Sequence, residues 1–364
     1  MKNIIVCLSA IIVLGITVFD LCAQAANEAQ NPDTLNRLIS TNVALTNDAI
    51  EYYEYMVGPL RGFNQASYDY MKVVTRTRRA RAVERSRQDL LKNLQSLKGF
   101  VGTCKPFQKD STLKAELIDY LDLVHIVFKE DFDKILDMED IREQSYDQAE
   151  AYQLALDLAI EKRKESYELF KKAEDNFFKK YQITVNKEKS ELALKIEKAN
   201  RAIKYFNYIN RIFFKVNKQD FYARKAVVTK DVAGLEQHAM TLISFAEEGL
   251  EKLKQDTGYD GDSELVSVTI KLLEYYKSEG ENNYPANVEF ILKADNFQNA
   301  SKKFNSIKKN DRKQEDIKQY NKAVLAYNKA IKEINKRNKA SDRKHKALHK
   351  SWEKAKDNFF KNHS

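Results

Sequence analysis

Proline and glycine are scarce in this chain, with 4 and 10 residues among 364. Both residues interrupt helices and supply tight turns, so their scarcity leaves few positions where a helix must end. Cysteine is scarcer still, with three residues, and only Cys104 lies beyond position 22. A disulfide-stabilised scaffold is therefore excluded, and stability has to come from helix packing. Cys104 either pairs with another chain or is buried beside Pro106 at a turn.

The start of the chain, at 1–25, has the pattern of a secretory signal. Lys2 supplies the positive start, residues 4–19 form an apolar run, and residues 23–25 (Ala-Gln-Ala) form a cleavage pattern. The apolar run is short for ~30 Å of hydrocarbon, which favours a cleaved signal over a membrane anchor. A lipid anchor at Cys22 is not expected, because lipidation signals have a small residue directly before the cysteine and this chain has a leucine there. We expect an exported protein of the periplasm, cell surface or medium, with a short leader at 26–32 and no transmembrane segment after signal removal.

Three short segments occur twice in the same order, which predicts a tandem duplication. The pairs are 47–56 (NDAIEYYEYM) with 200–209 (NRAIKYFNYI), 110–113 with 262–265, and 175–178 with 357–360. The last pair is spaced more widely than the first two, so the second copy carries an insertion, expected at about 279–308. We predict two helical bundle modules, at 33–183 and 188–364. What only one copy carries is the better candidate for function.

Apolar residues recur three and four positions apart along nearly the whole mature chain, which predicts helices. The first module is expected to contain helices at 33–75, 79–101, from 112, and up to about 178, with a kink near Gly58-Pro59. The second should contain helices at 188–228, 230–255, from 264, a short extra helix in the insertion, and a long last helix. No strand pattern is present. The expected fold is all-α, with two tandem elongated up-down bundles that have long first and fourth helices.

The last helix carries an apolar seam from Ile317 to Phe359, with the spacing of a coiled coil or bundle. A polar layer at Asn338, Ser341 and His345 interrupts this seam. When position 175 is aligned with 357, Arg163 of the first module lies at the level of His345. This layer is expected to fix the register of the helices or to mark where solvent enters the bundle.

Positive charge is concentrated near the end of the chain. Positions 302–356 contain 19 Lys and Arg against 6 Asp and Glu, a balance of +13, whereas the whole chain carries +9. A basic helical face can attract phosphates, anionic lipids or an acidic protein, or it can be a solvated outer face. The candidates for binding an anion or partner are Lys336, Arg337, Lys339, Arg343 and Lys344. Nucleic acid is not expected, since no groove-reading motif is present.

A second basic cluster surrounds the start of the second predicted helix. Cations there oppose the helix dipole, and the matching stretch of the second copy lacks them. The cluster is therefore not needed to build the module, and it is either a partner-binding surface or an exposed helix start. Its members are Arg76, Arg78, Arg79, Arg81, Arg85 and Arg87.

His345 and His349 lie one helical turn apart, a spacing that can place two imidazoles on one metal ion. They are weak metal candidates, because Asp342 is the one further ligand nearby in sequence. We identify no catalytic constellation and no cofactor site. The aromatic segments 52–55 and 205–208 occur in both copies and are expected to be packing residues rather than a stacking platform for a ligand.

The order of elements resembles a family of uncharacterised secreted or surface-exposed helical proteins of Bacteroidetes and Leptospira. The resemblance comprises a tyrosine-rich first helix, a leucine-striped second, a third beginning near Asp-Ser, and a closing helix ending in Ala-x-x-x-Phe. This last element occurs at 173–177 and 355–359. The resemblance implies an envelope or surface location and a four-helix module. It implies no catalytic residues.

Three functions remain open at this stage. The first is an exported, non-enzymatic interaction protein that binds an anionic or protein partner through its basic helical surfaces. The second is an enzyme or metal carrier with a site between the long helices. The third is a purely structural spacer. Oligomeric state and partner identity do not follow from the sequence.

Overall fold

The computed structural model describes residues 48–76, 80–131, 146–184 and 190–363. The expected signal, Cys22, Arg78 and Arg79 lie outside the described residues. Within the described ranges the chain is all-α, as predicted, and its β-structure is limited to two isolated bridges. The chain divides into two compact units, Met1–Asn207 with Phe360–Ser364 and Tyr208–Phe359, which are treated separately below.

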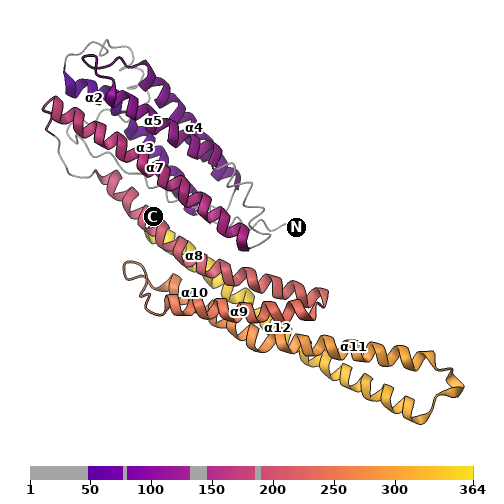
Figure 1. The fold of residues 1–364 in the computed structure, drawn as a ribbon. Coiled ribbons are helices and arrows are strands. Elements are labelled where there is room, and N and C mark those ends of the chain that lie inside the picture. Colours follow the sequence, from indigo (N-terminus) through magenta and orange to yellow (C-terminus); the bar gives the residue numbers. More distant parts are fainter. Residues whose placement is uncertain (1–47, 77–79, 132–145, 185–189, 364) are drawn as a thin grey trace. The chain divides into compact units, whose positions relative to one another are not determined.

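The first unit begins with α2 and α3, which are separated at Gly58-Pro59 as predicted, because proline cannot continue the hydrogen-bond ladder of α2. A short π-helical turn, η3, follows α5 directly. The last long helix, α8, begins in this unit and continues into the second (Figure 1). The bounds are α2 Ala49–Val57, α3 Leu60–Arg76, α4 Ala80–Thr103, α5 Thr112–Ile126, η3 Val127–Asp131, α7 Tyr146–Lys180 and α8 Glu191–Thr229.

Aromatic side chains of the duplicated segments are buried in the first unit. The ring of Tyr53 lies 4.8 Å from that of Phe178, measured between centroids, and Phe206 lies 4.8 Å from Phe360. These pairs occupy corresponding positions of the two copies. Tyr52 packs on Phe107 at 5.0 Å. The packing role predicted for this aromatic block is confirmed for these residues.

The second unit contains the rest of α8 and an extended set of helices. The long last helix, α12, has 50 residues, whereas α9 has 22. The prediction of a long first and fourth helix is confirmed here, since α8 has 39 residues. The remaining bounds are α9 Val232–Leu253, α10 Glu264–Ser278, η4 Glu279–Asn283, α11 Tyr284–Ser306, η5 Lys309–Asp311 and α12 Gln314–His363.

Three consecutive elements of the first copy, α4, α5 and η3, begin at a constant spacing from their counterparts α9, α10 and η4. The turn before the third helix recurs as well. Asp110 Oδ1 accepts a hydrogen bond from the Thr112 amide at 3.0 Å, and Asp262 does the same for Glu264. Left-handed backbone occurs at corresponding positions, including Gly261 with φ 84°. The tandem duplication remains a prediction. It leads us to expect that helix starts and turns recur at a constant spacing, as these do.

The insertion of the second copy is larger in structure than the short helix expected. The π turn η4 leads from α10 directly into α11, which has 23 residues. Pro285 lies in the first turn of α11, where a missing N–H is tolerated. The insertion therefore lengthens the third helix instead of adding a separate one. Together with the first part of α12 it forms a hairpin that extends past α9 (Figure 1).

Cys104 is buried just before the turn that leads to α5, with 3% of its surface exposed. Its Sγ lies 3.5 Å from the carbonyl oxygen of Phe100. Burial raises the pKa of the thiol to about 11. Of the two alternatives left by the sequence, the structure shows the buried thiol.

Candidate functional site

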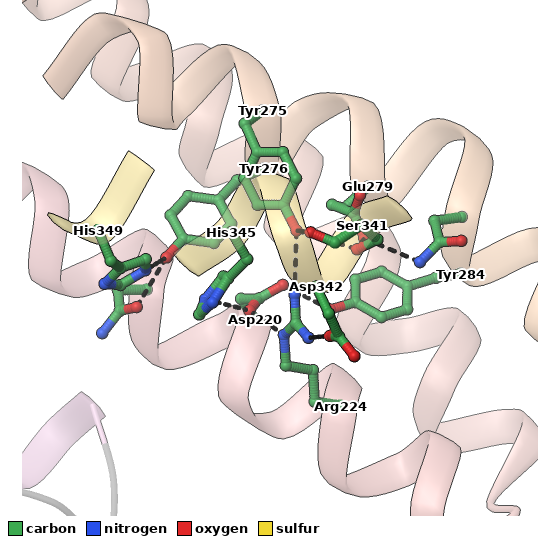
Figure 2. A network of polar contacts seen from close by, with 12 residues as sticks. Asp220, Arg224, Tyr275, Tyr276, Glu279, Tyr284, Ser341, Asp342, His345 and His349 are labelled. Carbon is green, nitrogen blue, oxygen red and sulfur yellow. Dashed lines mark hydrogen bonds and ion pairs between the residues drawn. The ribbon is translucent and has the colours of Figure 1, made fainter. Parts of the chain in front are cut away.

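Polar and ionisable side chains meet inside the second unit, where α8, α10, η4, α11 and α12 come together (Figure 2). At the centre, the Arg224 Nε donates to Asp220 Oδ2 at 2.6 Å, one helical turn away in α8. The Asp220 side chain is 2% exposed, and Tyr284 of α11 donates its hydroxyl to the second oxygen. A buried carboxylate is tolerated only when it is paired and hydrogen-bonded in this way.

Arg224 connects α8 with two other helices. Its Nη2 donates to the Tyr275 hydroxyl of α10 at 3.0 Å, and its Nη1 donates to Asp342 Oδ1 of α12 at 3.0 Å. Burial disfavours the charged guanidinium, but the neighbouring Asp220 carboxylate outweighs this effect and raises the pKa of Arg224. Arg224 is therefore a permanent cation at the centre of the network, and its planar fork suits three acceptors at once.

Glu279 lies in the π turn η4 and forms a second acidic centre. Its Oε2 accepts hydrogen bonds from Ser341 Oγ at 2.6 Å and from Asn283 Nδ2 at 2.8 Å. Because the serine hydroxyl donates to Glu279, the Tyr275 hydroxyl at 3.0 Å has to donate to Ser341. Burial raises the pKa of Glu279 above its usual range. Hydrogen bonds thus run from Arg224 through Tyr275 and Ser341 to this carboxyl group.

The two histidines predicted to lie together do so, with ring centroids 4.1 Å apart. His345 Nε2 lies 3.7 Å from Asp220 Oδ2. The Tyr276 hydroxyl donates to Asn217 Oδ1 at 2.7 Å and lies 2.7 Å from His349 Nε2. A phenol has a single proton, so the Nε2 of His349 carries a hydrogen and donates to Tyr276. Burial lowers the pKa of both imidazoles to about 4, so both are neutral at pH 7.

The arrangement favours a structural role over a reactive one. Among the residues that the structure describes, no group of three or more His, Cys, Asp or Glu side chains is placed to hold a metal ion. The Asp220 carboxylate is engaged by Arg224 and Tyr284, and His349 is engaged by Tyr276. The metal prediction therefore gains no support from this geometry. The network instead joins four helices at one level.

The predicted polar layer of α12 is confirmed. Asn338 exchanges hydrogen bonds with Asn287 of α11, with nitrogen–oxygen distances of 3.1 and 3.0 Å. One turn further along, Ser341 bonds Glu279, and His345 faces Asp220. Because these side chains face inward, the rotation of α12 about its axis is fixed, and the side chains on its opposite side face solvent.

Sequence reasoning did not single out Asp220, Arg224, Tyr275, Glu279 and Tyr284. A comparison of the two copies contained the signal for most of them. Where the second copy has Asp220, Arg224, Tyr275 and Glu279, the aligned positions of the first copy have serine, methionine, leucine and valine. Ionisable residues that replace buried positions in one copy mark a copy-specific site.

The arginine cluster of the first module is only partly a surface feature. Arg76 lies in the last turn of α3, where a cation is favoured, and Arg81 and Arg85 are exposed on α4. Arg87 is 5% exposed and is removed from the partner-binding candidates. Its Nη1 donates to the Phe128 carbonyl at 2.9 Å, and it also pairs with Glu84. The reason is its position on the apolar stripe of α4, which directs it into the bundle.

The basic residues of the last helix are surface residues. The five candidates Lys336, Arg337, Lys339, Arg343 and Lys344 are all exposed. Between positions 302 and 350, where every residue is described, 17 lysines and arginines occur and none forms an ion pair within 4 Å. On α8 to α10, by contrast, Lys215 and Lys252 share Glu248, and Lys277 pairs with Glu247. Positive charge without a carboxylate partner is thus concentrated along the hairpin and α12.

A ladder of stacked rings holds the α11–α12 hairpin together. Phe297 stacks on Tyr327 at 4.7 Å with planes 5° apart, and Phe304 stacks on Tyr320 at 4.4 Å with planes 4° apart. The guanidinium of Arg312 covers Phe304 at 4.2 Å. Further from the η5 turn, a cleft of about 70 Å³ lies between α11 and α12. Arg337, Glu289 and Glu333 are among the residues that line it.

Comparison of the chain with protein-family models, with curated proteins and with solved structures finds no match. The family resemblance seen in the sequence therefore remains a prediction. Among the described helices, none is both long enough and apolar enough to cross a bilayer. The evidence for function therefore comes from the buried polar network around Arg224 and from the basic surface of the α11–α12 hairpin and α12.

Proposed function

We propose that the protein is an exported, non-enzymatic helical protein that binds an anionic partner through the basic surface of the α11–α12 hairpin and α12. The absence of any ion pair for the cations of the described stretch 302–350 is the observation that supports this proposal most directly. Cations that neutralise no local carboxylate create a positive potential, which attracts polyanions and increases their rate of encounter.

The buried network supports this function by setting the orientation of α12. Ser341 and His345 are held inward by Glu279 and by the Asp220–Arg224 pair. Residues such as Lys339 and Arg343 lie on the opposite side of the same helical turns and are exposed. A one-residue rotation of α12 would bury lysines and expose the network, so the network keeps the basic surface outward.

A soluble polyanion tests this proposal. The full-length mature protein is expected to bind dextran sulfate at low salt and to lose that binding steeply as salt rises, because binding releases counterions and is screened. Reversing charge in K336E/K339E/K344E should weaken binding by at least ~150-fold at low salt, at roughly 1 kcal/mol for each of the three cations. Isothermal titration at two salt concentrations measures both effects.

The matched control is K252E/K254E/K271E, which reverses the charge of three exposed lysines outside the hairpin and α12. Two lie at the end of α9 and the third lies on α10. This variant should bind nearly as well as the wild type. Equal losses in both variants would show a net-charge effect rather than a defined surface. Wild-type protein that ignores the polyanion at low salt would contradict the proposed function outright.

A further inference from the structure

We infer that the tip of the α11–α12 hairpin, defined here as residues 302–322, docks on a bilayer surface that contains anionic phospholipid. This inference rests on the proposed function and names its partner. The tip comprises the end of α11, the η5 turn and the first turns of α12. Its first part, at 302–308, lies in the insertion expected in the second copy.

The charge of the tip points to a diffuse negative surface. Its 21 positions contain eight cations and three acids, and none of the cations forms an ion pair in this fully described stretch. One of the acids, Asp316, caps the start of α12 by accepting from the Lys313 amide at 2.9 Å. Positive charge at the tip is therefore left for an external anion.

The type of cation separates a lipid surface from an acidic protein. Seven of the eight are lysines, and the one arginine, Arg312, is stacked on Phe304. Arginine is the residue that binds a carboxylate in a defined two-pronged geometry, whereas lysine is a mobile point charge. Flexible lysines suit laterally mobile headgroups, which require attraction but no fixed geometry. The seven are Lys302, Lys303, Lys308, Lys309, Lys313, Lys318 and Lys322.

Apolar side chains accompany the lysines at the tip. Ile317, in the first turn of α12, is 42% exposed, and nearby Leu325 is 71% exposed. Ile307, at the C-terminal end of α11, is also partly exposed. Basic residues around a few exposed aliphatic groups form the pattern of surface-bound amphipathic segments, where the aliphatic groups enter the boundary between headgroups and acyl chains. The stacked aromatic ladder keeps these groups on a rigid end.

Vesicle sedimentation tests this inference with the full-length mature protein. Wild-type protein should bind vesicles that mix phosphatidylcholine and phosphatidylglycerol in a ratio of about two to one, and it should not bind pure phosphatidylcholine. Variant K303Q/K308Q/K309Q/K313Q should lose about 600-fold in partition, at about fivefold for each of the four neutralised lysines. Because these lysines are exposed, unchanged circular dichroism and Trp352 fluorescence should verify that the variant folds.

Two further variants locate the contact. K336Q/K339Q/K344Q/K346Q removes the same charge from the α12 surface outside the tip and should lower vesicle partition by a much smaller factor than the tip variant, because these lysines add attraction without touching the headgroups. I317S keeps every charge and should lower vesicle partition several-fold without changing dextran sulfate binding, because only a bilayer takes up the side chain. Equal losses in the two lysine variants, or an I317S variant that binds like the wild type, would overturn the assignment to the tip.

The remaining outcomes separate this inference from the proposed function. Wild-type protein that binds dextran sulfate but not phosphatidylglycerol vesicles would leave the proposed function standing and overturn the lipid assignment. Tighter binding to soluble polyglutamate than to the vesicles would overturn it in favour of an acidic protein. Wild-type protein that binds neither probe would remove both proposals.

Discussion

The two modules differ in the side chains that they bury at corresponding positions of their first helices, α3 and α8. In α8 these positions hold the Asp220–Arg224 ion pair, whereas the corresponding positions of α3 are Ser67 and Met71, both buried. At these two positions the first module therefore has no ions, although its buried Arg163 lies at the level of His345. Since apolar replacements of buried ion pairs are often neutral or stabilising, the pair in α8 is not required for stability alone. We expect it to select one register of the helices around it.

The third helix and its π turn repeat this contrast. Leu123 and Val127 of the first module correspond to Tyr275 and Glu279 of the second. Val127 is 3% exposed and apolar, whereas Glu279 is 7% exposed and hydrogen-bonded to α12. Only the second module has to orient a basic helix, and only that module contains polar groups at these positions that distinguish one helix rotation from another. If the modules are copies, the π turn belongs to the scaffold that they share, and its side chains differ with the surface that each module presents.

The largest loss of stability is expected when only Arg224 of the ion pair is replaced by the corresponding residue of the first module. R224M introduces the methionine of Met71 but leaves Asp220 buried without its cation, which should cost about 3–5 kcal/mol of unfolding free energy. Urea unfolding followed by fluorescence reports on this unit, because Trp352 is the single tryptophan and stacks on Phe213 at 4.3 Å.

The double variant D220S/R224M decides whether the comparison is sound. It introduces both residues of the first module and removes both buried charges, so it should recover a substantial part of the lost stability. A double variant that is as unstable as R224M would contradict the idea that the two modules have interchangeable solutions at this level.

A smaller effect is expected from the reverse exchange in the first module. Arg87 corresponds to Ala239, and R87A removes the hydrogen bond from Arg87 to the buried Phe128 carbonyl together with the ion pair to Glu84. Loss of a hydrogen bond from a charged donor costs about 1.5–3 kcal/mol, so amide hydrogens of α4 and α5 should exchange roughly tenfold faster or more. Hydrogen-exchange mass spectrometry measures this, with R85A, on the exposed side of α4, as control. Unchanged exchange in R87A would show that the carbonyl contact contributes nothing.

The last expected effect concerns pH. The pKa of His345 and of His349 is about 4 in the folded chain, whereas an unfolded histidine titrates near 6.5. Between these values the unfolded state binds more protons, so the free energy of unfolding should fall as pH falls from about 6.5 to 4. Glu279 acts in the opposite direction, because its raised pKa favours the folded state as pH falls.

H349Y introduces the residue of the first module, Tyr167, and should remove roughly half of the histidine-dependent loss. Urea midpoints measured by Trp352 fluorescence at pH 7, 5.5 and 4.5 check this. The groups that face the histidine pair are Asp220 and Arg224 of α8, Tyr275 and Tyr276 of α10, and Asp342, Lys346 and Glu353 of α12. An H349Y variant whose midpoint changes with pH just as the wild type's does would show that His349 is not buried in its neutral form.

Periodicity and helix-breaking residues predicted the elements well. The break at Gly58-Pro59 and the start of α10 after Ser263 follow from local chemistry, which a sequence displays directly. The polar layer at Asn338 was also visible, because it interrupts an otherwise apolar seam. The π turns were not predicted, since one extra residue in a helical turn leaves no periodic signature of its own.

The candidate site was harder to predict than the fold. Asp220 and Arg224 resemble an ordinary exposed pair one turn apart, and only tertiary packing reveals that the carboxylate is buried. The insertion was expected to contain a short separate helix, but the π turn η4 leads from α10 directly into α11, which has 23 residues. Arg87 was assigned to a surface cluster by its charge, although its position on the apolar stripe of α4 indicated burial.

The solitary thiol of Cys104 has a consequence for the lifetime of the protein in the oxidising environment that export would bring. Only the thiolate reacts, and a pKa of about 11 with 3% exposure keeps it unreactive while the first module is closed. Each transient opening of that module exposes an ordinary cysteine to oxidants for as long as the opening lasts. Oxidation adds polar atoms to a side chain that is almost fully buried, so we expect chains whose first module opens often to be oxidised first.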